Sequence, residues 1–260
     1  MRTFQARPIH HHPVDFWNSA DGLCHIMIPL LISCEHATCA VPDANRELFH
    51  NDEELLTSPE GWDPGALNLA QAMAMRFRTQ LVHGEITKLL IDLYPAGENR
   101  RWSRFSKSLT DAQRARMAER HLATHMDALQ QRVADETKRA GRILHISVHT
   151  FPTNEAVSLI EAHVALGFDP FSETSAGAAR CWRKAFQSRA PDLSMEFNPA
   201  APLIDLGLTA VLAGWHGGSG YAGIVLEVAQ SFFLEGRPWR WEKLKKALID
   251  SLADALEEAW

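Results

Sequence analysis

The chain has 260 residues, of which 46 % are hydrophobic and 22 % are charged. These values are ordinary for a folded soluble protein, and the length allows one large domain or two small ones. The formal net charge of −6 argues against a nucleic-acid or anionic-membrane partner, because such partners select a basic surface. No signal peptide or membrane-spanning run is visible, so we expect a cytoplasmic protein. The oligomeric state is not indicated.

The first 25 residues are rich in Pro and His and lack hydrophobic periodicity. We predict an irregular N-terminal arm over residues 1–25 and a single α/β domain over residues 26–260. The run His10–His12 suggests a metal site at first sight. A surface segment without a ligand explains it more simply.

From residue 26 onward, apolar runs that are typical of buried strands alternate with segments of helical periodicity. The predicted strands are Ile28–Ser33, Ile86–Leu93, Ile143–Val148, His163–Phe168, Leu193–Phe197 and Gly223–Val228. The predicted helices are Asp63–Phe77, Thr110–Ala140, Ser172–Ser188 and Glu242–Ala259. The long helix opens with a capping box, Thr110 and Gln113, and stops at Gly141. This pattern predicts a three-layer α/β sandwich, with a mostly parallel or mixed sheet and helices on both faces.

Polar side chains stand where several of these apolar runs end. His36 follows the first predicted strand, His149 ends the third, and Glu227 interrupts the last. Asp63 lies just before the first long helix, where it could equally serve as the N-cap residue. In open α/β sheets, ligands bind outside the carboxyl ends of the strands, so these side chains are expected at one edge.

Two histidines, one carboxylate and an open position form the ligand set of hydrolytic zinc centres. We therefore predict that His36, Asp63 and His149 bind one Zn²⁺ per chain. The plainer alternatives are a surface histidine for His36 and a hydrogen-bonded core histidine for His149. A carboxylate inside an apolar strand is costly unless it is paired or near a cation, and Glu227 beside a metal would suit a general base. A structural ion pair is the alternative for Glu227.

At these residues the sequence resembles the N-formylglutamate amidohydrolase family. The matching segments, which follow one another from about residue 28 to residue 235, are ISCEHATCAVP (Ile32–Pro42), WDPGA (Trp62–Ala66), LLIDL (Leu89–Leu93), HISVHTF (His145–Phe151), ALGFDP (Ala165–Pro170) and YAGIVLEVAQ (Tyr221–Gln230). The resemblance implies a fold related to zinc exopeptidases and cell-wall amidases. It implies hydrolysis of the N-formyl or N-acyl amide of an amino acid such as N-formylglutamate, with Glu227 as the base. Glu35 becomes the alternative acidic ligand if Asp63 is only a helix cap.

The substrate-binding features depart from the family. Members often carry Asn-Arg directly after the strand that matches LLIDL, whereas here Tyr94–Glu98 intervenes. A later Asn-x-Pro-Tyr-like segment lacks its Tyr. Arg suits the bidentate binding of a substrate carboxylate. The remaining candidates for substrate binding are Arg100, Arg101, Arg104 and Asn198, and a solvated basic loop is the alternative for the arginines.

A Gly-rich stretch, Gly214–Gly220, precedes the strand that carries Glu227. It could form a lid over the site, with His216 reaching the oxyanion of the reaction. A plain surface loop is an equally good interpretation.

Three rival functions remain at this stage. Cys34 could act as a thiol nucleophile with His149 as its base, although a buried cysteine at a strand end is usually inert. The chain could be a non-catalytic metal- or ligand-binding protein on the same fold. It could also be an amidase that acts on peptidoglycan-type amides. The presence of Glu227 favours an enzyme, because a site without activity would be free to lose a buried charge.

Overall fold

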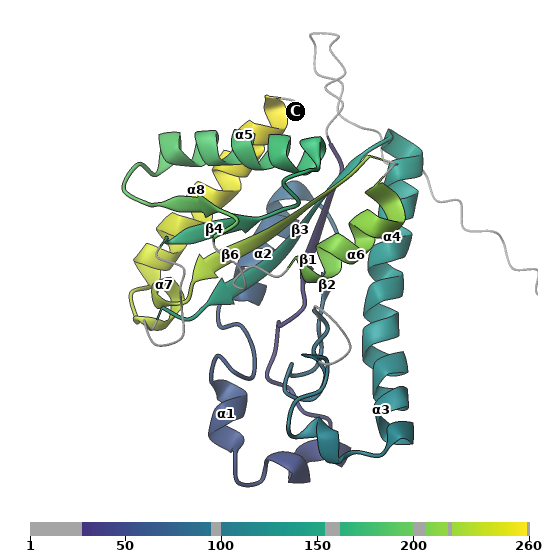
Figure 1. Cartoon of the computed structure of the whole chain (residues 1–260). Helices are drawn as coiled ribbons and strands as arrows, with labels where there is room; N and C mark the ends of the chain where they lie inside the picture. The colour runs from purple at the N-terminus through teal and green to yellow at the C-terminus, as the bar shows by residue number, and fades with distance from the viewer. Residues whose placement is uncertain (1–27, 95–99, 154–161, 200–205, 218–219, 259–260) are drawn as a thin grey trace, which may run out of the picture.

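The computed structural model describes residues 28–94, 100–153, 162–199, 206–217 and 220–258. The N-terminal arm predicted over residues 1–25 lies outside these residues. Figure 1 shows a twisted sheet with helices on both of its faces. Among the described helices, none is both long and apolar enough to cross a membrane.

Six strands form one sheet within the described residues, in the order β2-β1-β3-β6-β4-β5. Strands β1, β2, β3 and β6 are parallel, whereas β4 runs antiparallel to β6 and pairs in parallel with the edge strand β5. The predicted mixed, mostly parallel sheet is therefore confirmed. The strands are β1 Leu30–Cys34, β2 Leu81–His83, β3 Ile143–Phe151, β4 Val164–Gly167, β5 Met195–Phe197 and β6 Tyr221–Ala229.

The alternation of side chains along the buried strands builds two cores, one on each face of the sheet. In β1, Leu30 and Ile32 pack with helices α2, α5 and α8, whereas Leu31 packs with α4 and α6 on the other face. The three predicted layers are thus present (Figure 1). The α-helices are α1 Glu53–Thr57, α2 Ala66–Phe77, α3 Asp111–Met117, α4 Thr124–Ala140, α5 Glu173–Arg189, α6 Gly207–His216, α7 Ser231–Leu234 and α8 Pro238–Glu257.

A third apolar cluster lies beyond the carboxyl ends of β1 and β2. It is formed by turns, by the 3-10 helices Asp43–Phe49 and Ser106–Ser108, and by the start of the long helix. In Figure 1 this lobe, which includes α1 and α3, extends below the sheet. Because the lobe grows from the loops that follow β1 and β2, it borders the edge of the sheet where ligands are expected.

The prediction of a strand over Ile86–Leu93 is wrong. These residues form turns, and the apolar ones among them pack in the third cluster instead of the sheet. The hydroxyl of Thr87 donates to the carbonyl of Gly61 at 2.8 Å, and the backbone N–H of Leu90 donates to the carbonyl of Thr87 at 3.0 Å. A short apolar run shows that a segment is buried, but it does not by itself specify extended backbone.

The long helix has the ends that the sequence predicts. The backbone N–H of Gln113 donates to the Thr110 hydroxyl at 3.3 Å, and the backbone N–H of Thr110 donates to the Gln113 side chain at 2.9 Å. The helix is divided into α3 and α4 by a π-helical segment, Ala118–Ala123, and it ends before Gly141. The sequence pattern does not reveal this π-helical interruption, nor does it reveal helix α6.

The turns that lead into β3 and β6 contact each other through two glycines. Gly220 has a φ of 83°, and a Cβ atom built there would lie 2.1 Å from the carbonyl oxygen of Gly141. Gly141 has a φ of 74°, but a Cβ atom there would meet nothing within 4 Å.

We expect Gly141→Ala to lower the free energy of unfolding by about 1 kcal/mol, because the only cost is that of placing alanine in the left-handed conformation. Gly220→Ala should lower the free energy of unfolding by about 3 kcal/mol, because the new Cβ atom also clashes with the carbonyl of Gly141.

Urea unfolding of the two alanine variants measures this difference under identical conditions. Equal losses of stability in both variants would contradict the close approach of the two turns.

Candidate metal centre and active site

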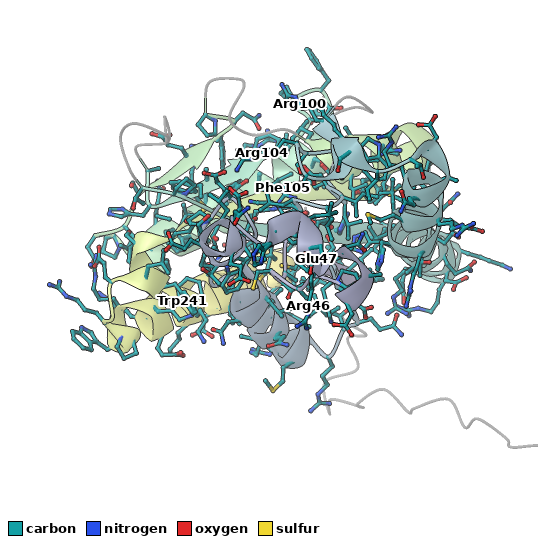
Figure 2. All side chains as sticks on the ribbon, turned by 90° about the horizontal axis from the view of Figure 1, so that it is seen from below. Arg46, Glu47, Arg100, Arg104, Phe105 and Trp241 are labelled. Carbon is teal, nitrogen blue, oxygen red and sulfur yellow. The ribbon has the colours of Figure 1, made fainter. Side chains whose placement is uncertain are left out.

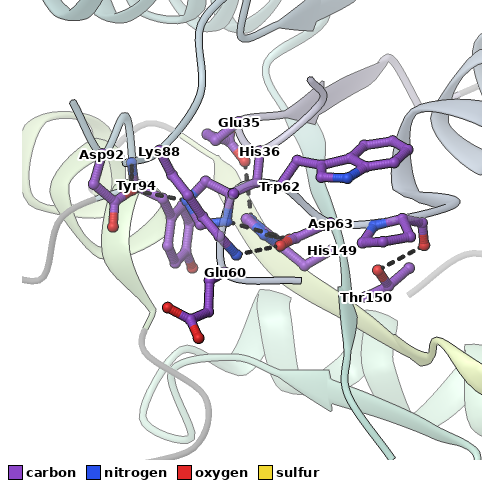
Figure 3. A network of polar contacts seen from close by, with 12 residues as sticks. Glu35, His36, Glu60, Trp62, Asp63, Lys88, Asp92, Tyr94, His149 and Thr150 are labelled. Atoms are coloured by element: carbon purple, nitrogen blue, oxygen red, sulfur yellow. Dashed lines mark hydrogen bonds and ion pairs between the residues drawn. The ribbon is translucent and has the colours of Figure 1, made fainter. Parts of the chain in front are cut away.

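The side chains of His36, Asp63 and His149 meet at the carboxyl ends of β1 and β3 (Figure 3). The Nδ1 atom of His36 lies 3.2 Å from Oδ2 of Asp63, and Nδ1 of His149 lies 2.9 Å from the same oxygen. The two imidazole rings meet edge to face, with 4.9 Å between their centroids. The three residues predicted as ligands are therefore brought together, with one atom of each directed at a common point.

Asp63 is not the cap of helix α2. The residue that precedes the helix is Gly65, in a left-handed conformation and without a side-chain capping hydrogen bond. Oδ2 of the Asp63 carboxylate instead faces Nδ1 of both histidines, and Oδ1 accepts from Nζ of Lys88 at 2.7 Å. The backbone N–H of Asp63 donates to the carbonyl of His36 at 2.9 Å, which ties the two loops together. The capping interpretation of Asp63 is therefore wrong.

The donor set fits a divalent metal ion of the zinc type. Tetrahedral zinc with bonds of about 2.0–2.1 Å places its ligand atoms about 3.3 Å apart. The separations of 2.9 and 3.2 Å around Oδ2 of Asp63 are close to this value. Two imidazole nitrogens and one carboxylate oxygen are three of the four donors of a hydrolytic zinc centre, so a bound zinc ion would keep a position for water or substrate.

A carboxylate stands behind each of the two histidines. Nε2 of His36 lies 2.8 Å from Oδ1 of Asp92, and Nε2 of His149 lies 3.0 Å from Oε2 of Glu35. Such partners keep the proton on Nε2 and leave Nδ1 free to bind a metal. Glu35 thus lies on the far side of His149 from the cluster, so the alternative in which Glu35 replaces Asp63 as a ligand does not fit the structure.

When both histidines are neutral, the centre carries an excess of negative charge. Burial opposes ionisation of Asp63, but the Lys88 charge and the hydrogen bonds of His36 and His149 hold the pKa of Asp63 well below its usual range. Burial likewise opposes protonation of His149, yet Asp63 and Glu35 raise the pKa of His149 well above its usual range. The carboxylates can be balanced either by protons on the imidazoles or by a bound cation.

Glu227 stands beside the cluster on the neighbouring strand. In the pairing of β3 with β6, Glu227 lies opposite His149, so both side chains project from the same face of the sheet. Burial raises the pKa of Glu227 to about 7, against the opposing influence of His149. A carboxyl group that titrates near neutrality can both accept and return a proton.

A cavity of about 290 Å³ opens over these residues. Besides the three cluster residues and Glu227, its lining includes Lys88, Asp92, Tyr94, Arg100, Thr150, Phe151 and Pro152. The cavity thus combines metal-ligating groups, a carboxyl group that titrates near neutrality and two basic side chains.

The model of the N-formylglutamate amidohydrolase family matches residues 28–233 of this sequence. The chain belongs to this family. It is therefore an amidohydrolase, an enzyme that hydrolyses carbon–nitrogen bonds in amides other than peptides. No curated protein matches the sequence.

Two solved structures share the fold of this amidohydrolase. A gene product of Agrobacterium tumefaciens is 18 % identical with a TM-score of 0.66, and the match covers 90 % of this chain and 93 % of that one. The N-formylglutamate amidohydrolase of Ralstonia eutropha is 14 % identical with a TM-score of 0.65, covering 87 % and 93 %. At such identities the likeness shows the fold alone.

The arginines predicted to bind substrate occupy different surroundings in the amidohydrolase. Arg100 lines the cavity. Arg104 is exposed, forms an ion pair with Asp52 at 2.7 Å and lies over the ring of Phe105. Figure 2 labels Arg104 and Phe105 as seen from below. Arg101 contributes its carbonyl, which accepts the backbone N–H of Asp92, and like Arg104 it does not line the described cavity.

Asn198 serves a turn at the far edge of the sheet. Its side-chain oxygen accepts from the backbone N–H of Phe168 at 2.8 Å, and its φ of 41° is left-handed. Strand β5, which ends just before Asn198, is separated from β6 by β4. Asn198 is therefore not brought to the described cavity, and its local role explains its presence.

His216 is the last residue of helix α6, and β6 begins only at Tyr221. Glu227 lies near the opposite end of that strand. Because a strand rises about 3.3 Å per residue, His216 is placed at the amino end of β6, away from the cluster. His216 is therefore too far from the cluster to make the contact with the oxyanion that the sequence suggested.

The Cys34 nucleophile hypothesis does not fit the structure either. Cys34 packs with Ile32 in the core on the side of helix α2, whereas His149 projects from the other face. Burial, followed by the nearby charge of Glu35, raises the pKa of the Cys34 thiol well above its usual value. The thiol therefore stays protonated, which makes it a poor nucleophile.

Sequence reasoning missed Lys88, Asp92 and Tyr94, which all line the cavity. Lys88 and Asp92 lie within the segment predicted as a strand, Ile86–Leu93, and Tyr94 follows it directly. The ring of Tyr94 packs against His149, with 4.5 Å between the ring centroids. One signal was present: Asp92, like Glu227, interrupts an apolar run. A charged residue in such a position is costly unless it has a partner.

A second buried histidine, His145, lies deeper on the same face of β3. Its Nε2 is 2.8 Å from the Ser33 hydroxyl and its Nδ1 is 2.8 Å from the Tyr221 hydroxyl. Burial lowers the pKa of His145 to about 4, compared with about 6.5 in an unfolded chain. Between these two values the unfolded chain binds a proton that the folded chain does not, so stability is lost as the pH falls.

This difference predicts the pH dependence of unfolding. Between about pH 7.5 and about pH 5, the wild-type protein should lose about 2 kcal/mol more stability than His145→Gln, because Gln keeps a polar side chain but does not titrate. Urea unfolding at both pH values tests this, with the more exposed His163→Gln as the control. An equal loss in the wild type and in His145→Gln would show that His145 is not kept neutral.

Proposed function

We propose that this amidohydrolase is metal-dependent and cleaves the N-formyl or N-acyl amide of an amino acid of the N-formylglutamate class. The observation that carries the proposal is the convergence of His36, Asp63 and His149 next to Glu227, inside a cavity that also presents two cations. Nitrogen and oxygen donors in this number favour Zn²⁺, at one ion per chain.

His36 and His149 would hold the ion through Nδ1, and Asp63 through Oδ2. Lys88 occupies Oδ1 of Asp63 at 2.7 Å, so this carboxylate offers one oxygen to the cluster. A bound zinc ion polarises the scissile carbonyl group and lowers the pKa of the attacking water.

Glu227 would act as the general base and then as the general acid. It accepts a proton from the attacking water and returns it to the nitrogen of the departing amine. The raised pKa of Glu227, about 7, suits both transfers, because the group exchanges a proton readily near neutral pH. A non-catalytic binding protein would have no need of this carboxylate among apolar neighbours.

Two basic side chains support an anionic substrate. Lys88 and Arg100 line the cavity on the side of the turn segment, and a guanidinium group can bind a carboxylate through two hydrogen bonds. A cavity of about 290 Å³ suits a small amino-acid derivative better than a polymeric cell-wall substrate. Such a substrate belongs to cytoplasmic amino-acid catabolism, and neither a membrane nor a nucleic acid is needed as a partner.

Metal binding is the first testable consequence. The wild-type protein, purified without a His tag and treated with a chelator, should take up one zinc ion per chain. His36→Ala and His149→Ala should each weaken zinc binding by about 100-fold or more, because each removes one of three ligands. Competition with a chromophoric chelator measures the affinity, and His163→Ala, whose partner is Ser194, is the control. Absence of zinc binding in the wild type would refute metal dependence.

Catalysis by Glu227 is tested separately from metal binding. Glu227→Gln should lower kcat for formate release from N-formyl-L-glutamate by about 100- to 10 000-fold, with zinc affinity changed only slightly. Glu196→Gln, an exposed change on β5, should leave the rate unaltered. If the wild type binds zinc but releases no formate, the substrate assignment fails and other N-acyl amino acids become the candidates.

A further inference from the structure

Behind His149 lies a buried group of polar side chains that takes no part in the proposed reaction. Glu35 is 1 % exposed, and its partners Ser147 and His125 are 0 % and 5 % exposed. Oε2 of Glu35 lies 2.6 Å from the Ser147 hydroxyl and 3.0 Å from Nε2 of His149. Its other oxygen, Oε1, lies 3.3 Å from Nε2 of His125. Figure 3 shows Glu35 at the edge of the cluster.

A carboxylate in this position is expensive, because removing a charge from water costs several kcal/mol unless hydrogen bonds replace the solvent. An apolar side chain would fill the same space without this cost. Both oxygens of Glu35 have hydrogen-bond partners. One partner is Nε2 of His149, whose other ring nitrogen, Nδ1, lies in the metal cluster. The arrangement therefore connects a buried charge to the orientation of His149.

The hydrogen bonds determine which nitrogen of His149 carries the proton. Ser147 has a single hydroxyl proton, and at 2.6 Å it donates this proton to the Glu35 carboxylate, which has none to give. Nε2 of His149 then faces two acceptors, the Ser147 oxygen and the Glu35 oxygen, each 3.0 Å away. Nε2 must therefore hold a proton. In the neutral ring the lone pair is then on Nδ1, which points toward Asp63.

His125 restrains the carboxylate from a distant part of the chain. It lies in the first turn of α4, directly after the π-helical segment Ala118–Ala123, and shares the buried face of α4 with Leu129 and Val133. A π-helical segment shifts the faces of a helix relative to each other and often occurs near functional sites. By holding Oε1, His125 limits rotation of the Glu35 carboxylate.

We propose that Glu35, oriented by Ser147 and His125, is a positioning residue that sets the tautomer and ring orientation of His149 and thereby strengthens and shapes the metal site. This inference rests on the proposed function, since it presumes a metal at the cluster. Asp92 supports His36 in a different environment, because its side chain is 25 % exposed and lines the cavity. The buried partner is thus the one that solvent cannot replace.

The test compares two carboxylate-to-amide changes in the full chain. Glu35→Gln keeps the shape of the side chain but replaces one carboxylate oxygen, an acceptor, with an amide NH₂ group, a donor. It should therefore weaken zinc binding by about 10- to 100-fold. It should also shift the visible absorption spectrum of the Co²⁺-loaded protein, which reports ligand geometry. Glu136→Gln is the matched control: Glu136 is 5 % exposed and pairs with Arg132 and Arg139 on α4. It should alter stability but leave zinc affinity and the cobalt spectrum as in the wild type.

Folded Glu35→Gln with wild-type zinc affinity and an unchanged cobalt spectrum would overturn the inference. If Glu35→Gln does not fold, Ser147→Ala takes its place, with an expected loss of about tenfold in zinc affinity; unchanged affinity in this variant would overturn the inference as well. If the wild type binds neither zinc nor cobalt, the proposed function itself fails. Tight binding by the wild type with no effect of Glu35→Gln refutes only the positioning role.

Discussion

The parallel pairing of β3 with β1 on one side and with β6 on the other is the constraint on which the site depends. Parallel strands end at the same edge of a sheet, so the residues that follow β1 and those that close β3 meet there. The register places His149 opposite Glu227 and Ser33 opposite Ser147. A shift of one residue would turn each of these side chains toward the apolar core on the other face.

Charge balance at this edge explains why so many polar groups are held close together. Asp63 faces Nδ1 of two histidines with one oxygen and accepts from Lys88 with the other, and each histidine has a second carboxylate behind it. Asp63, Asp92 and Glu35 outnumber Lys88, so negative charge is in excess when both histidines are neutral. Such a site has a strong electrostatic preference for a cation at the point where the ligand atoms converge.

The side chains around the cluster come from two kinds of backbone. The sheet supplies His149 and Glu227 on rigid, paired strands, which suits groups that must keep their relative positions. The turn segment after β2 supplies Lys88, Asp92 and Tyr94, held by local hydrogen bonds and by a separate apolar cluster. Substrate contacts can vary through this lobe while the catalytic edge of the sheet is unchanged.

The sequence by itself determined the alternation of strands and helices, the ends of the long helix, and the set of polar residues that close apolar strands. Those features depend on near neighbours in the chain, and a charge inside an apolar run is visible without coordinates. Tertiary structure alone decided what each polar atom faces. Asp63 became a partner of His149, 86 residues away, rather than a helix cap, and Glu35 became a partner of Ser147, 112 residues away, rather than a ligand. Contacts between residues this far apart are set by packing of the whole sheet, which no local pattern contains.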